Sequence, residues 1–163
     1  MDLYECIDHE GIQCYNERKD GSCKHVVRPF EKKFDFEKGP LKSGSGKDMV
    51  LVIPFKCEVR VKSICFISGD DGEAPQTMKL YKNEEVVDIN IQEEKKAVQE
   101  IELNQGDLEY PTNMSKFTNV SKIIIGVDGS FGATRSSLKF VGLKGDKLRE
   151  KTKIGETVYE VRA

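Results

Sequence analysis

The sequence contains no tryptophan, only two histidines, and five cysteines without a Cys-x-x-Cys pair. The lack of tryptophan, with aromatic residues at 8%, argues against a stacked-aromatic platform for sugars or bases. His9 and His25 lie in an irregular N-terminal stretch without serine and aspartate arranged around them, which argues against a catalytic triad. Without a Cys-x-x-Cys pair, thioredoxin-type redox catalysis is not expected. We therefore expect neither an enzyme activity nor a catalytic residue.

An excess of one charge and long apolar runs are also missing. The 163 residues include 26 Lys and Arg against 28 Asp and Glu, a formal net charge of −2. This balance does not favour nucleic acid or a membrane surface as a partner. No segment approaches the ~20 apolar residues of a membrane span, and Met1–Cys6 lacks the basic and apolar parts of a secretory signal. We expect one soluble, intracellular domain over residues 1–163.

Cysteines and acidic turns are the candidate metal ligands. Cys14, Cys23 and His25 could supply three zinc ligands, but structural zinc takes four, usually from close pairs, and no second pair is present. The acidic loop residues around Asp70 and Asp128 do not have the spacing of an EF-hand. We expect no metal and no cofactor. An odd number of cysteines without a secretory signal predicts reduced thiols.

Residues 49–68 carry the clearest structural signal. The first part, Met49–Phe55, is apolar on both faces, which is typical of a strand covered on two sides, and the apolar residues of 57–61 then alternate with charged ones. The apolar positions change parity after this point, because Ile64 and Phe66 are even-numbered. A one-residue shift turns every side chain to the other face, so we expect a bulge or break near Lys62.

Glycines, prolines and charged runs divide the rest of the chain. Residues 1–48 are expected to form an irregular segment that wraps a sandwich. Its apolar side chains are expected to pack into the core: Val26, Val27, Phe30, Phe34 and Phe36. Residues 49–143 read as the sandwich core of short alternating strands. The segment Gln92–Gln99 has good helix propensity and fits a turn of helix or a charged loop equally well, and we favour the loop. Residues 144–163 read as a C-terminal tail that ends in a candidate edge strand, Val158–Val161.

These short strands, with turn signals between them and little helix, predict an all-β, antiparallel sandwich or barrel. No heptad pattern or long apolar stripe suggests self-association, so a monomer is expected. The stretch Lys42–Lys47 is similar to a phosphate-binding loop but lacks Gly at Leu41 and Ser or Thr at Asp48. We interpret it as a flexible turn.

Eight motifs occur in a fixed order along the chain. They are Cys14-Tyr-Asn-Glu17, Ile53-Pro-Phe55 with the following Val59-x-Val-Lys-x-Ile64, Gly69-Asp-Asp-Gly-x-Ala-Pro75, Met78-Lys-Leu-Tyr-Lys-Asn83, Asp107-Leu-Glu-Tyr-Pro111, Lys116-Phe-Thr-Asn-Val120, Phe131-Gly-Ala-Thr134 and Phe140-Val-Gly-Leu143. Together they resemble the PITH domain, the proteasome-interacting domain of thioredoxin-like proteins, over about Leu3 to Glu160. Stand-alone members are more similar than the two-domain, thioredoxin-like ones. The relatives tend to be acidic before the strand at Met49, whereas this chain is not.

The resemblance implies a jelly-roll sandwich of the galactose-binding-like type. It also implies a non-enzymatic domain that associates with the proteasome regulatory particle, or a proteasome cofactor, in cytoplasm and nucleus. The alternative is a module that binds a small ligand or glycan. The resemblance supplies no residue-level site.

Loop placement alone selects the candidate partner-binding residues, because jelly-roll sandwiches often bind through loops gathered at one end. Asp70 and Asp71 lie in the first loop piece, Gly69–Ala74, and Phe131 and Arg135 lie in the second, residues 128–135. Arg135 is the first candidate. Phe131 is either an exposed anchor or a buried plug of its loop.

Overall fold

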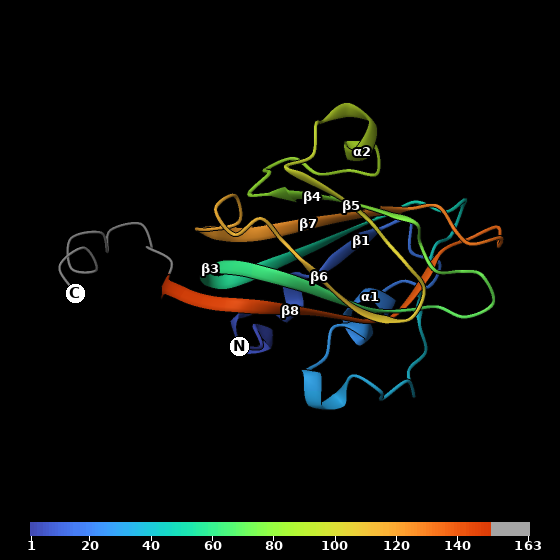
Figure 1. The fold of residues 1–163 in the computed structure, drawn as a ribbon, viewed down its shortest axis with the longest axis horizontal. Helices are drawn as coiled ribbons and strands as arrows, with labels where there is room; N and C mark the ends of the chain where they lie inside the picture. The colour runs from blue at the N-terminus through green and yellow to red at the C-terminus, as the bar shows by residue number, and fades with distance from the viewer. Residues whose placement is uncertain (151–163) are drawn as a thin grey trace.

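One long strand, β3 (Met49–Ser68), belongs to both layers of the computed structural model, which describes residues 1–150 (Figure 1). The other strands are β1 (Gln13–Tyr15), β2 (Leu41–Lys42), β4 (Thr77–Lys82), β5 (Gln99–Glu102), β6 (Asp107–Pro111), β7 (Val120–Asp128) and β8 (Ser137–Glu150). The first half of β3 lies between β1 and β7, and β7 continues to β4 and β5. The second half lies between β6 and β8, and β8 continues to β2. All these pairings are antiparallel, so the predicted all-β antiparallel class is confirmed.

The bulge predicted near Lys62 is present in β3. Pairing with β8 shifts register between Val61 and Ser63. Before the shift odd-numbered residues such as Val59 face the main core, and after it even-numbered residues such as Phe66 do. The extra residue therefore keeps one core filled from both halves of a strand that changes layers.

A small lobe, residues 84–98, covers the outer face of the layer that contains β4 and β7 (Figure 1). The lobe contains a short helix, α2 (Ile91–Glu94), where a loop was expected over Gln92–Gln99, so that expectation is wrong for its first residues. The Tyr81 hydroxyl donates to the carbonyls of Ile91 and Lys95, both at 3.2 Å. These long-range contacts stabilise a turn that charged residues alone leave ambiguous.

Residues 1–48 contain only short elements. These are η1 (Tyr4–Cys6), η2 (His9–Gly11), β1, α1 (Ser22–Val26), η3 (Phe30–Lys32) and β2. Val26 and Val27 are buried, and Phe30 packs edge-on against Phe140 of β8 with ring centroids 5.5 Å apart. Phe34 and Phe36 are instead 65% and 39% exposed, so the prediction that they pack into the core is wrong.

Strand β8 corrects the boundary that we expected between core and tail. The strand does not end at Leu143 but continues to Glu150 and pairs with β3 through Lys147 and Arg149. Its charged side chains face outward, where Asp146 lies 3.1 Å from the Lys62 ammonium. A half-exposed strand can therefore carry a charge-rich sequence. The candidate edge strand Val158–Val161 lies outside the described residues.

Candidate functional site

The two loop pieces selected from the sequence lie against each other at one end of the sandwich (Figure 1). The Gly72 carbonyl accepts a hydrogen bond from the Phe131 amide at 2.8 Å, and the first loop is further tied to β8 by the Ser137 amide, which donates to the Glu73 carbonyl at 2.7 Å. Gly72 has φ of +79°, and a Cβ there would lie 2.7 Å from the Phe131 carbonyl oxygen. Glycine is therefore required at this joint for both conformation and space.

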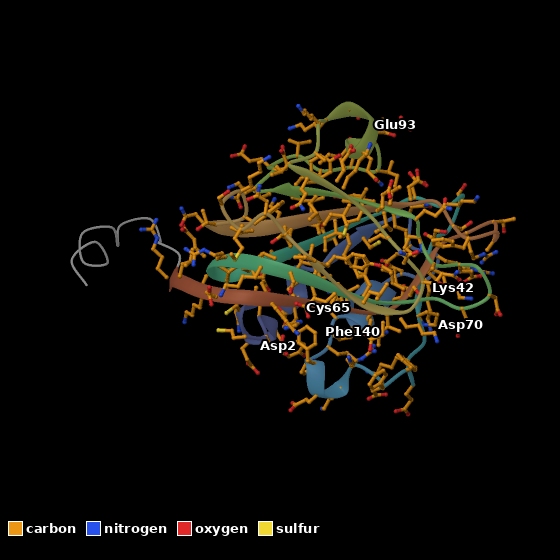
Figure 2. All side chains as sticks on the ribbon, in the orientation of Figure 1. Asp2, Lys42, Cys65, Asp70, Glu93 and Phe140 are labelled. Atoms are coloured by element: carbon orange, nitrogen blue, oxygen red, sulfur yellow. The ribbon has the colours of Figure 1, made fainter. Side chains whose placement is uncertain are left out.

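A hollow of about 330 Å³ opens beside the first loop. Its lining comes from three distant parts of the sequence: Phe36, Pro40 and Lys42; Gly69, Asp70, Asp71 and Glu73; and Ser137 and Lys139. Figure 2 shows Lys42 and Asp70 close to one another at this end of the molecule. We call this cavity the loop hollow. Its size lies at the lower end of the range for small-ligand pockets.

Carboxylates and ammonium groups both line the loop hollow, and they form ion pairs. Lys139 Nζ lies 2.7 Å from Asp70 Oδ2, and Lys42 Nζ lies 3.6 Å from Glu73 Oε1. The Ser137 hydroxyl also donates to Glu73 Oε1 at 2.9 Å. The lining holds three carboxylates and two ammonium groups, so its formal charge is only −1 and does not strongly favour a ligand of either sign.

The four candidate residues have different environments. Asp70 and Asp71 are exposed and line the loop hollow. Phe131 is half-buried, and its backbone joins the loops. Arg135 is also half-buried, and within residues 1–150 its side chain has no ion-pair partner. The structure thus brings both loops together, but places only the two aspartates at the cavity.

Two exposed phenylalanines beside the loop hollow were not selected from the sequence. Phe34 and Phe36, which we call the aromatic ledge, pack edge to face with centroids 6.3 Å apart. Lys33 Nζ lies 5.0 Å from the Phe34 centroid, and Lys139 Nζ lies 5.1 Å from that of Phe36. Cations at this distance are attracted to the ring faces. The sequence signal that could have shown their exposure is the run of charged residues around them, 31–38, which is too polar for a buried segment.

The N-terminal motif Cys14-Tyr-Asn-Glu17 has a structural role next to this site. The Asn16 amide donates to the carbonyls of Ser45 and Asp48, both at 2.7 Å, and therefore holds the turn over Lys42–Lys47 that we expected to be flexible. The Glu17 carboxylate accepts hydrogen bonds from the backbone amides of Gly21 and Cys23, both at 3.0 Å. These bonds fix the entry to α1.

The cysteine thiols are the nucleophilic groups that burial affects most strongly. All five cysteines are free thiols in the structure. Burial raises the pKa of Cys14, raises that of Cys23 to about 12 and raises that of Cys65 to about 11, so these thiols stay protonated at neutral pH. Within residues 1–150, no three His, Cys, Asp or Glu side chains are grouped as metal ligands. No helix in that part of the chain is long and apolar enough to cross a bilayer.

The fold is similar to solved carbohydrate-binding modules from Clostridium perfringens. The family 32 CBM from NanJ, in complex with galactose, gives a TM-score of 0.57 at 10% identity, over 85% of this chain and 96% of that one. CpGH89CBM32-5, in complex with GalNAc-beta-1,3-galactose, gives 0.60 at 8% identity, over 88% and 99%. The CBM32-1 and CBM32-2 domains of ZmpB, with GalNAc, give 0.59 at 13% identity over 94% of this chain, which spans only 36% of theirs. The molecule is thus an antiparallel β-sandwich of the galactose-binding-like type, which confirms the predicted class.

The sequence relationship defines the family. The PITH domain model matches residues 1–163. The human PITH domain-containing protein 1 is 35% identical over 148 residues, which cover 88% of this chain and 69% of that protein. The Dictyostelium discoideum protein of the same name is 31% identical over 161 residues, which cover 97% and 79%. The chain belongs to the PITH domain family, as its motifs indicated.

Proposed function

We propose that this chain is a non-enzymatic protein-interaction domain that associates with the proteasome regulatory particle, or a proteasome cofactor, in cytoplasm and nucleus. The family's name as a proteasome-interacting domain supports the identity of the partner. The contact surface consists of the joined loops, the loop hollow and the aromatic ledge. The observation that carries this surface is the exposure of Phe34, 65% of whose surface is in contact with solvent beside a charged loop.

The aromatic ledge has the anatomy of a binding hot spot. Aromatic residues and arginine are enriched at such centres, whereas the surrounding polar rim excludes water and contributes little energy. Here the rim consists of ion pairs: Lys33 with Asp107 at 2.9 Å and Lys139 with Asp70 at 2.7 Å. A partner that covers the rings would bury apolar surface that now contacts water.

The first prediction concerns Arg135, which can meet an acidic group on the partner. Arg135→Glu should leave the free energy of unfolding within about 0.5 kcal/mol of the parent, because the side chain has no ion-pair partner within residues 1–150. Capture of purified proteasome particles should weaken by about 2 to 3 kcal/mol, because repulsion replaces attraction at the interface.

Thermal melting and a proteasome pull-down, run on the same preparations, provide the test. The matched control is Lys96→Glu, the same charge reversal at an exposed residue of the 84–98 lobe. A folded Arg135→Glu protein that captures particles as well as the parent would exclude this loop from the site. A parent chain that captures none would exclude the proteasome as partner.

A second candidate, the binding of a neutral sugar or related small ligand, is favoured by the lining of the loop hollow. Phe36 offers a ring for stacking, while the carboxylates can accept hydrogen bonds from hydroxyl groups and the ammonium groups can donate to them. Nuclear magnetic resonance titration with galactose and GalNAc tests this candidate. Shifts confined to residues that line the loop hollow, abolished in Phe36→Ala, would support it, and unchanged spectra at millimolar sugar would reject it.

A further inference from the structure

A second hollow, of about 500 Å³, adjoins the loop hollow. It is lined by Arg18, Lys19, Ser22, Lys38, Gly39, Pro40 and Lys42. Four of these residues are cationic and none is acidic, in a chain whose formal net charge is −2. Pro40 and Lys42 line both hollows, so the two cavities share a wall. We call the second cavity the basic hollow.

Three of the four cations of the basic hollow have no ion-pair partner within residues 1–150. Lys42 Nζ lies 3.6 Å from Glu73, whereas Arg18, Lys19 and Lys38 are exposed and form no ion pair within residues 1–150. The carboxylate of Glu17 accepts hydrogen bonds at the entry to α1, one of them from the Ser22 hydroxyl of the lining, and offsets part of this positive charge. Like charges gathered in a concave surface raise the local potential and attract an oppositely charged ligand.

We propose that the basic hollow binds an acidic, extended segment of the partner protein. Two or three carboxylates enter the basic hollow, and an adjacent apolar side chain packs against Pro40 and Phe36 at the junction with the loop hollow. The proposal rests on the proposed function, because it gives the chemistry of the partner at the same end of the molecule. Arg18 is the residue best suited to pair with a carboxylate through two hydrogen bonds.

A protein segment fits this surface better than a nucleic acid. A long polyanion that extended from the basic hollow into the loop hollow would meet the carboxylates of Asp70, Asp71 and Glu73. The cationic area is thus a local patch and not the continuous stripe that tracks a phosphate backbone. A short segment can place its carboxylates and its apolar residue separately, each in the hollow that suits it.

Fluorescence anisotropy with a labelled ten-residue peptide tests the ligand chemistry. The probe alternates Asp and Glu around one central Leu, and its counterpart carries Asn and Gln in place of the acids. The acidic probe should bind at least about tenfold more tightly at low salt, and its affinity should fall as salt is added. Equal affinity for both probes would overturn the proposal, and so would tighter binding of a ten-nucleotide oligothymidylate.

Matched variants locate the binding. The double reversal Arg18→Glu with Lys38→Glu should weaken binding of the acidic probe at least about tenfold, because two attractive charges become repulsive. Lys96→Glu, the same reversal in the 84–98 lobe, should change it less than about twofold. If the charge reversal disturbs the fold, the neutral double variant Arg18→Gln with Lys38→Gln takes its place. Its affinity for the acidic probe should be about threefold weaker than that of the parent. Unchanged probe binding in the folded double variant would exclude the basic hollow.

The proteasome pull-down keeps this inference distinct from the proposed function. If the parent captures particles and the double variant captures them equally well, the basic hollow is not the contact, while the proposed function stands. If the parent captures no particles but still prefers the acidic probe to its amide counterpart, the proteasome is excluded and the basic hollow remains a site for acidic segments.

Discussion

Replacing Phe66 by alanine is expected to lower the free energy of unfolding by about 3 to 5 kcal/mol. The side chain is 2% exposed in the main core, and its ring lies 6.2 Å from that of Tyr110 between centroids. Removing the ring deletes this packing and leaves a cavity that rigid strands on both sides of β3 cannot fill. Denaturant unfolding of parent and variant measures the loss.

The matched control is Phe34→Ala, the same chemical change in the aromatic ledge. Because Phe34 is 65% exposed, its loss should change the free energy of unfolding by less than about 1 kcal/mol. The Phe34→Ala protein should nevertheless lose proteasome capture, since exposed aromatic anchors dominate binding energy at interfaces. Similar destabilisation by both substitutions would contradict the assignment of Phe66 to the core and Phe34 to the surface.

A methyl group at Gly145 is expected to destabilise the sandwich by about 3 kcal/mol or more. Gly145 lies opposite Val61, next to the bulge where β3 and β8 change register. A Cβ at this position would lie 1.8 Å from the Arg60 carbonyl oxygen, a backbone atom that moves only if the two strands separate. Gly145→Ala should therefore melt many degrees below the parent.

Gly44→Ala is the control for that substitution. Gly44 is exposed, its φ is not in the left-handed region, and the nearest atom to an added Cβ is the Asn16 side-chain oxygen at 3.2 Å. The contact is short by only a few tenths of an ångström, whereas the one at Gly145 is far shorter, so the cost should stay below about 1 kcal/mol even though Asn16 is hydrogen-bonded. An equal loss of melting temperature in the two alanine variants would show that the close approach of β3 and β8 is not the reason why Gly145→Ala is destabilised.

Strand parity explains why much of the fold was predictable from the sequence. The even-numbered Ile64 and Phe66 could share a core with the odd-numbered Val59 and Val61 only through a bulge, and the bulge lies at that point. Glycine and acidic turns likewise predicted the loop at Gly69–Ala74. Such features depend on residues that are neighbours in the sequence, so a local sequence pattern can predict them.

The features that could not be predicted depend on contacts between distant residues. The helical turn of α2 is stabilised by the Tyr81 hydroxyl. Phe34 and Phe36 look like core residues by type, but Arg28 holds their segment outside the sandwich by donating to the carbonyls of Lys32, Lys33 and Lys139.

The candidate site was harder to predict than the fold, for the same reason. Both candidate loops were found, because loop residues are recognisable one segment at a time. The loop hollow requires Lys42 from β2, Glu73 from a loop and Lys139 from β8 to lie together. Only the antiparallel pairing of β2 with β8 brings these residues to one end, and a single sequence contains no signal for that pairing.

Hydroxyl-radical footprinting of the chain, free and in the presence of purified proteasome particles, tests the central claim most directly. Phe34 and Phe36 are exposed and should be oxidised in the free chain and protected when particles are present. Met114, which is 49% exposed and lies outside the proposed surface, is the internal standard and should be oxidised equally in both samples. Protection of the aromatic ledge without protection of Met114 is the predicted result. Unchanged oxidation of both phenylalanines while the chain is bound, or protection of Met114 instead, would contradict the proposed interaction surface.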